Sequence, residues 1–181
     1  ACTLRQCQML SKSGLLSLLF TLLLLPAAVV AGKWTVPPAA AIASAHPAAT
    51  EAGMRILRQG GNAFDAAVTV TAVLAVAEPY SSGIGGGGFY LLHKAGDGLT
   101  TMLDARERAP LEATREMYLD SDGEPTTASL EGPLSAGIPG IPAALVELAI
   151  AHGSLPLQQT LQPAIEIASE GFAVDEHYLR M

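Results

Sequence analysis

Two segments in the middle of the chain alternate apolar and polar residues with the period expected of β-strands. The first covers residues 89 to 94 and the second covers residues 99 to 106. The sequence Ala-Gly-Asp-Gly at 95 to 98 is typical of a reversal between antiparallel strands. Four glycines at 85 to 88 precede the first strand, and we expect them where the backbone passes close to another group or takes a positive φ. The pattern therefore predicts a β-hairpin with a glycine-rich entry.

Helical spacing of apolar residues appears on both sides of this hairpin. The spacing predicts helices over residues 47 to 59, 63 to 77, 142 to 152, 156 to 170 and 174 to 181. Asn62 and Asp65 have the spacing of a capping box at the start of the second helix. Because that helix carries one charge and is apolar on every side, we expect it to be buried on all faces. We expect residues 39 to 45, which are small and apolar, to form a buried strand.

The most hydrophobic segment lies near the start of the chain. Residues 15 to 31 form a run of about 17 apolar or small residues, which is short against the ~20 that span a bilayer. Lys12 precedes the run, Pro26 interrupts it, and Val-Val-Ala ends it, a pattern that favours a cleavable secretory signal after Ala31. We therefore expect export to the periplasm or the cell exterior, with a membrane signal anchor as the alternative. The basic segment after Met9 suggests that the natural start is Met9.

Charge and cysteine content narrow the possible function. Beyond residue 31 the chain keeps 8 basic residues against 17 acidic ones, a net charge of about −9. An acidic chain without a basic cluster gives no electrostatic reason to expect nucleic acid as a partner. Both cysteines, Cys2 and Cys7, lie before the expected cleavage point, so the mature chain has no disulfide or cysteine-ligated metal.

Several segments resemble functional motifs but lack the required spacing. Ser81 and Ser82 are not in a GxSxG sequence, and residues 83 to 88 fit GxGxxG but precede a strand instead of opening a helix. The acidic residues 120 to 124 fit turn chemistry better than a calcium loop. No pair of histidines has the spacing of metal ligands, and we interpret all four as structural: His46, His93, His152 and His177. We expect no metal and no cofactor.

Five sequence motifs together resemble one enzyme family. They are HPAATEAGMRILRQGGNAFDAAV at 46 to 68, EPYSSGIGGGGFYLL at 78 to 92, LDARERAP at 103 to 110, AGIPGIPAAL at 136 to 145, and LQPAIEIASEGFAVDE at 161 to 176. In this order they resemble the amino-terminal part of the large subunit of γ-glutamyltranspeptidases, which are amino-terminal-nucleophile hydrolases. The resemblance covers about residues 40 to 181.

The resemblance implies a fold and a place within it. The implied class is α+β, part of a four-layer αββα sandwich in which two antiparallel sheets lie between helical layers. Residues 1 to 31 are then upstream residues and signal peptide. Residues 32 to 181 are the amino-terminal portion of the γ-glutamyltranspeptidase domain, truncated before the catalytic subunit.

The resemblance also implies an activity: transfer of a γ-glutamyl group from glutathione or a related amide to water or to an amino-acid or peptide acceptor. The family nucleophile is a threonine freed by autocatalytic cleavage of a zymogen, and it begins a small catalytic subunit cut from the same precursor. That threonine lies downstream of these motifs, so we expect the fragment alone to be inactive and to contain no catalytic residue. The alternatives are a β-lactam (cephalosporin) acylase of the same family and a secreted, non-catalytic binding fragment.

Arg106 is the one substrate-binding residue that the resemblance places in this chain, as the group that binds the α-carboxylate of the γ-glutamyl donor. A planar guanidinium suits this role because it forms two parallel hydrogen bonds to a carboxylate. From spacing alone, a structural ion pair with Asp104 or Glu107 is the favoured interpretation, and the family match reverses that preference.

Overall fold

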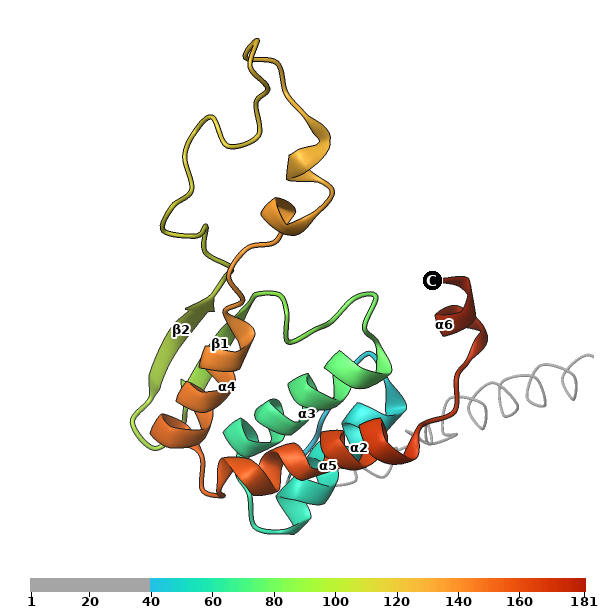
Figure 1. Cartoon of the computed structure of the whole chain (residues 1–181). Helices are drawn as coiled ribbons and strands as arrows, with labels where there is room; N and C mark the ends of the chain where they lie inside the picture. Colours follow the sequence, from blue (N-terminus) through green and yellow to red (C-terminus); the bar gives the residue numbers. More distant parts are fainter. Residues whose placement is uncertain (1–39) are drawn as a thin grey trace, which may run out of the picture. The chain divides into compact units, whose positions relative to one another are not determined.

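The computed structural model describes residues 40 to 181, so the expected signal and its cleavage site lie outside the described residues. The described part forms five α-helices, a two-stranded sheet, two 3₁₀ turns and one π-helical turn (Figure 1). No helix in this part of the chain is both long and apolar enough to cross a membrane. The elements are α2 (Pro47–Arg58), α3 (Ala63–Ala77), β1 (Gly88–Lys94), β2 (Leu99–Ala105), η1 (Thr127–Ser129), η2 (Pro133–Ser135), α4 (Ile141–Glu147), η3 (Leu148–His152), α5 (Leu157–Glu170) and α6 (Glu176–Arg180).

The predicted hairpin is present. β1 and β2 pair antiparallel, with Gly88 opposite Ala105 and Lys94 opposite Leu99. One face of the pair, which includes Leu92, packs against α3 and α4 in a cluster with Val68 and Leu145. Its other face is open and apolar: exposed side chains there are Phe89, Leu91 and Met102. One face of the hairpin is therefore covered by helices, and the other carries exposed apolar side chains.

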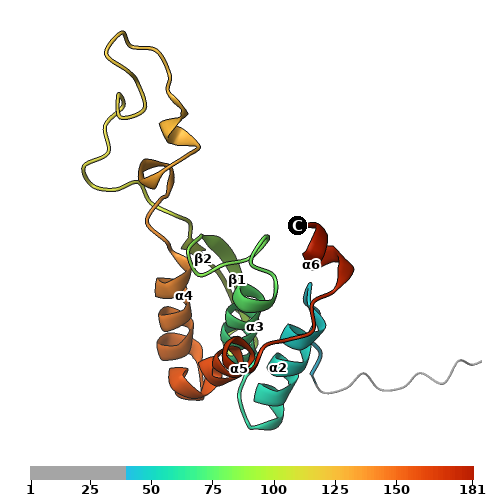
Figure 2. The ribbon, with the colours of Figure 1, turned by 45° about the vertical axis from the view of Figure 1, so that its right-hand side comes forward.

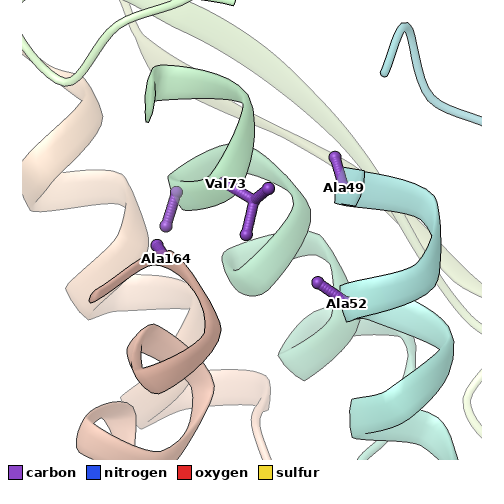
Figure 3. Close-up of a cluster of buried hydrophobic side chains, with 5 residues drawn as sticks. Ala49, Ala52, Val73 and Ala164 are labelled. Atoms are coloured by element: carbon purple, nitrogen blue, oxygen red, sulfur yellow. The ribbon is translucent and has the colours of Figure 1, made fainter. Parts of the chain in front are cut away.

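Helix α3 lies between α2 and α5, and small side chains line these contacts (Figure 3). Ala49 and Ala52 of α2 and Ala164 of α5 are buried against Val73 of α3. Alanine at a helix contact permits close approach of the two backbones, so the helices interlock without large side chains. The guanidinium of Arg55 on α2 also pairs with the Glu166 carboxylate on α5, at 2.7 Å, outside this apolar contact.

The start of α3 is held by the predicted capping box. The Asn62 side chain accepts hydrogen bonds from the N–H groups of Phe64 and Asp65, and the Asp65 carboxylate accepts one from the Asn62 N–H at 2.8 Å. The same carboxylate, which is fully buried, also accepts from the backbone N–H groups of Ser154 and Leu155. Asp65 therefore ties the α3 start to the turn before α5.

Two expectations are corrected, one about a strand and one about the burial of α3. Residues 40 to 45 do not form a strand: their side chains alternate between half-buried and exposed, but no strand in residues 40 to 181 pairs with them. Helix α3 is not buried on all faces, because α2, α5 and the hairpin cover only part of it. Its face around Val70 opens onto a groove of about 700 Å³ that Ile42 and Tyr90 also line. Seven of its residues are buried and most of the others are half-buried.

The segment from 106 to 140 connects β2 to α4 and is drawn from yellow-green to orange in Figures 1 and 2. It begins and ends at one place, because Arg108 and Ile138 form an isolated antiparallel bridge with N···O distances of 3.1 and 2.7 Å. A second bridge joins Leu119 and Pro125 within the loop. The loop base is therefore fixed beside the end of β2.

Candidate substrate-binding site

Arg106 lies directly after the end of β2. The strand ends at Ala105, one residue before the end that the sequence pattern predicted. The Asp104 side chain turns the chain here, because its Oδ1 accepts a hydrogen bond from the backbone N–H of Arg106 at 2.9 Å. The Arg106 side chain is 72% exposed. The guanidinium is thus presented at a strand end by a local turn that does not use it.

Arg106, Glu107 and Arg108 line two different clefts in alternation. Arg106 and Arg108 line one of them, a cleft of about 460 Å³ that we call the arginine cleft. Glu107 lines the other, a cleft of about 390 Å³ that also includes Ser81 and Ser82. The remaining lining of the arginine cleft comes from the end of β2, the chain before α4 and α4 itself: Leu103, Asp104, Ala105, Ile138, Pro139, Gly140, Ala143, Ala144 and Glu147.

The chain before α4 forms a fixed wall of the arginine cleft. The carbonyl of Gly86 accepts hydrogen bonds from the N–H groups of Gly140 and Ile141, both at 3.2 Å. Gly140 also lies so close to the Ala105 carbonyl that a Cβ there would collide with it. Glycine is therefore required at 140 for α4 to begin beside the end of β2.

Glu107 packs closely against Gly87 and Gly137, which together we call the glycine seat. A Cβ at Gly87 would lie 2.5 Å from the Oε2 of Glu107, and a Cβ at Gly137 would lie 2.9 Å from the Cβ of Glu107. The expectation that the glycines at 85 to 88 mark a close approach is thus confirmed at Gly87. None of those four takes a positive φ. At Gly85 the space beside the backbone is open.

The Arg106 guanidinium forms a weak ion pair with Glu107. Its Nε lies 3.7 Å from the Oε2 of Glu107, whose side chain is 39% exposed. An exposed pair at this distance contributes little to stability, about 0 to 1 kcal/mol. Among the described residues, no ion pair joins the Arg106 guanidinium to Asp104, the first partner that the spacing suggested.

Other polar groups near the site have identifiable roles. Burial raises the pKa of Tyr90, although its contact with the Thr71 hydroxyl at 3.5 Å acts in the opposite direction, so the phenol stays protonated at neutral pH. The backbone N–H groups of Ser81 and Ser82 both donate to the Glu78 carbonyl, which is turn chemistry.

The histidines do not gather at the cleft. His46 caps α2 through its Nδ1, which accepts from the Ala48 N–H at 3.1 Å, and His93 contacts the Thr100 hydroxyl at 2.9 Å across the hairpin. Across residues 40 to 181, no three His, Cys, Asp or Glu side chains come together in a way that would hold a metal ion.

A family model described as Gamma-glutamyltranspeptidase matches residues 49 to 181. The chain belongs to the γ-glutamyltranspeptidase family. The match includes the cleft, the glycine seat and the helices around α3. The five sequence motifs therefore identified the family correctly, and the hairpin with its helices confirms the α+β class.

Individual members of the γ-glutamyltranspeptidase family agree with this assignment. The glutathione hydrolase proenzyme of Escherichia coli (strain K12) is 43% identical over 136 residues, which are 75% of this chain and 23% of that protein. The crystal structure of Helicobacter pylori γ-glutamyltranspeptidase has a TM-score of 0.77 at 39% identity, covering 81% of this chain and 42% of that one. This chain thus spans about a quarter of the length of the curated relatives.

A solved structure with a different substrate in its name is also similar. The cephalosporin acylase of Bacillus halodurans has a TM-score of 0.65 at 31% identity, covering 84% of this chain and 30% of that one. The backbone of this region is therefore similar in proteins whose names differ in substrate, so the fold of these residues alone does not decide the substrate.

The resemblance singled out Arg106, and the structure places this residue in a cleft whose other lining residues the sequence analysis did not single out. Arg108, from the same LDARERAP motif, and Glu147, on α4, also line this cleft, and the sequence analysis gave neither a role. The available signal was the alternation Arg-Glu-Arg beyond the strand end, which puts the two arginines on one side and Glu107 on the other.

Proposed function

We propose that these residues belong to a γ-glutamyltransferase or glutathione hydrolase, which cleaves γ-glutamyl amides and passes the acyl group to water or an amino-acid or peptide acceptor. The observation that carries this proposal is the family match across residues 49 to 181, which includes an open cleft with Arg106 at its edge. A cleft of about 460 Å³ is within the range that small-molecule ligands occupy.

In this proposal Arg106 binds the α-carboxylate of the γ-glutamyl group. Support comes from its position. The guanidinium is exposed, and the Asp104 carboxylate accepts a hydrogen bond from the backbone N–H of Arg106 instead of from the guanidinium. Glu107 lies 3.7 Å from the Nε atom of the guanidinium. The two terminal nitrogens of the guanidinium are then available for a bidentate contact with a carboxylate. The contact fixes the orientation of the donor as well as its charge.

The chemistry is assigned to a threonine downstream of the residues given. Its hydroxyl attacks the amide carbonyl, its own α-amine takes the hydroxyl proton, and the amine leaving group departs with a proton. The resulting γ-glutamyl ester is then hydrolysed or aminolysed. We propose that this threonine begins a small subunit released from the same precursor by self-cleavage, and that residues 32 to 181 open the large subunit.

The same proposal extends to the fold. We propose that the hairpin forms part of a four-layer αββα sandwich, in which a second sheet covers Phe89, Leu91 and Met102. Their exposure of 55%, 78% and 65% supports this arrangement, because large apolar side chains grouped on one sheet face favour burial.

A cephalosporin acylase is the second candidate, and the similarity to the Bacillus halodurans enzyme favours it. It would use the same threonine chemistry on a different acyl group. The two candidates differ in their need for an α-carboxylate contact at Arg106, so the donors that the protein accepts distinguish them.

The deciding experiment has a genetic and an enzymatic part. The coding sequence beyond Met181 should encode a threonine at a cleavage junction, and the purified complete protein should separate into two subunits and release the amine from a γ-glutamyl anilide. A stop codon after Met181 would instead favour the non-catalytic binding fragment. Release from a cephalosporin amide, without release from the anilide, would favour the acylase.

We also propose that the protein is exported to the periplasm or the cell exterior and cut after Ala31. The basic start, apolar run and Val-Val-Ala ending support this proposal. Amino-terminal sequencing of the exported protein should begin at Gly32 or within a few residues of it. Recovery of the intact apolar segment in the membrane fraction would instead show a signal anchor.

A further inference from the structure

We propose that Arg108 is a second carboxylate-binding residue of the arginine cleft and directs the protein towards γ-glutamyl donors whose leaving group carries a free carboxylate. The inference rests on the proposed function and extends it from the γ-glutamyl group to the leaving group. Its starting observation is that Arg106 and Arg108 line one cleft while Glu107, between them, lines the other.

The backbone holds Arg108 in place without using its side chain. Its N–H donates to the Ile138 carbonyl at 3.1 Å, and its carbonyl accepts from the Ile138 N–H at 2.7 Å. Both bonds would persist with any side chain other than proline at 108. In residues 40 to 181 no carboxylate forms an ion pair with the Arg108 guanidinium, and the residue is exposed. The side chain is therefore available to a ligand.

The arginine end of the cleft offers two guanidinium groups to a ligand that carries two carboxylates. Of the two acidic residues of the cleft, Asp104 already accepts the Arg106 N–H, and Glu147 lies at the other end of α4 from Gly140. Helical rise places Glu147 about 9 Å along α4 from Ile141. The end formed by Arg106, Arg108 and Ile138 thus holds two guanidinium groups, and among the described residues only that of Arg106 has a carboxylate partner, Glu107 at 3.7 Å.

The spacing of the two arginines suits a γ-glutamyl peptide. Alternate residues of an extended chain lie about 6.5 Å apart, and their guanidinium groups can spread further. The two carboxylates of an extended γ-glutamylglycine are about 9 Å apart by standard bond geometry. With the α-carboxylate at Arg106, the carboxylate of the leaving group can therefore reach Arg108. A leaving group without that carboxylate loses the contact.

Two donors that differ in one group test this directly: γ-glutamylglycine and γ-glutamylglycinamide. In the complete protein, the ratio of kcat/KM for the acid to that for the amide should be about ten or more. Arg108→Gln should lower this ratio about tenfold, mainly through KM of the acid, and Arg108→Lys should lower it less because the charge remains. Added salt should also lower the wild-type ratio, since the site is exposed.

Two further variants serve as controls. Arg115→Gln makes the same charge change in the loop but outside the cleft lining, and it should keep the wild-type ratio. Arg106→Gln should slow both donors and keep the ratio, because the α-carboxylate is common to them. A wild-type ratio near one, or an unchanged ratio in Arg108→Gln, would overturn the role of Arg108.

The test remains decisive if the proposed function is wrong. If the complete protein turns over neither donor, calorimetric binding of the same two compounds replaces kinetics. The wild type should then bind the acid about tenfold more tightly than the amide, and Arg108→Gln should remove the difference. Equal binding of the two compounds by the wild type would reject the proposal.

Discussion

The Oδ1 atom of Asp104 accepts a hydrogen bond from the backbone N–H of Arg106, at 2.9 Å. The two residues are therefore coupled through the main chain, and the Arg106 guanidinium takes no part in the turn. An asparagine at 104 would keep an oxygen acceptor in the same place. A structural role for the Arg106 side chain would have to act through Glu107, whose Oε2 is 3.7 Å from the Arg106 Nε.

Alanine substitutions at Gly85 and Gly87 should show whether glycine is needed there for close contact with Glu107 or only for backbone flexibility. In Gly87→Ala the new Cβ meets the Glu107 carboxylate, so the complete protein should lose about 1 to 3 kcal/mol of unfolding free energy and part of its activity. Gly85→Ala meets open space at an ordinary φ and should be neutral or stabilising by up to about 1 kcal/mol. Urea unfolding of both variants provides the measurement. Equal effects at 85 and 87 would contradict the seat for Glu107.

The buried carboxylate of Asp65 should contribute more to the free energy of unfolding than a capping-box residue usually does. It accepts backbone N–H groups from Asn62, Ser154 and Leu155. Asp65→Asn replaces one acceptor oxygen by an NH₂ group that faces these donors, and it should cost about 2 to 4 kcal/mol in urea unfolding.

The exposed Asp122→Asn makes the same chemical change in the loop and should shift the unfolding free energy by less than about 0.5 kcal/mol. An Asp65→Asn protein as stable as the Asp122→Asn protein would show that the 153 to 155 turn is held by other contacts.

The ion pair between α2 and α5 predicts a pH dependence with a definite sign. The hydrogen bond from Arg55 lowers the pKa of Glu166 in the folded protein. A lowered folded-state pKa stabilises the fold above the unfolded pKa of about 4.3, and this contribution is lost as pH falls through the folded value. Glu166→Gln should therefore lower the melting temperature at pH 7, and its difference from wild type should shrink towards pH 3.

Glu170→Gln removes one charge from the same helix without a partner like Arg55 and is the matched control. A difference between Glu166→Gln and wild type that grows as the solution is acidified would contradict the stabilising pair.

Residues 32 to 181 alone should neither hydrolyse a γ-glutamyl anilide nor unfold cooperatively. The open hairpin face with Leu91 and Met102, and the partly covered α3, leave apolar surface in water. Surface of this kind favours association, so the isolated segment should elute as aggregates in gel filtration. A monomer with a sharp thermal transition would show that these residues form a self-sufficient domain.

Features set by neighbouring residues could be predicted from the sequence. The capping box at Asn62 and the hairpin from Gly88 to Ala105 follow from local spacing, turn residues and alternation. The helices begin and end close to the predicted positions for the same reason. The family motifs pointed to Arg106 as a substrate-binding residue, a role that stays a prediction, whereas spacing alone favoured a structural ion pair.

Features that depend on distant partners could not be predicted in the same way. Residues 40 to 45 have the composition of a strand, but a strand also needs a hydrogen-bonding neighbour. The contact of Glu107 with Gly87 and that of Asp65 with Ser154 join residues far apart in sequence. Sequence periodicity carries no information on such pairs. The shared cleft of Arg106 and Arg108 became visible only once the alternation beyond β2 was placed against α4.

We propose that the Arg106 guanidinium binds the substrate and does not stabilise the fold, and kcat/KM of Arg106→Gln for a γ-glutamyl anilide tests this role most directly. Loss of a charged bidentate contact should cost on the order of 2 to 5 kcal/mol, a decrease of tens-fold to thousands-fold. Arg106→Lys should recover part of the rate. Asp104→Asn should stay near wild type, and all three should keep subunit processing and melting temperature. A normal KM in Arg106→Gln, together with lost stability or failed processing, would contradict the account.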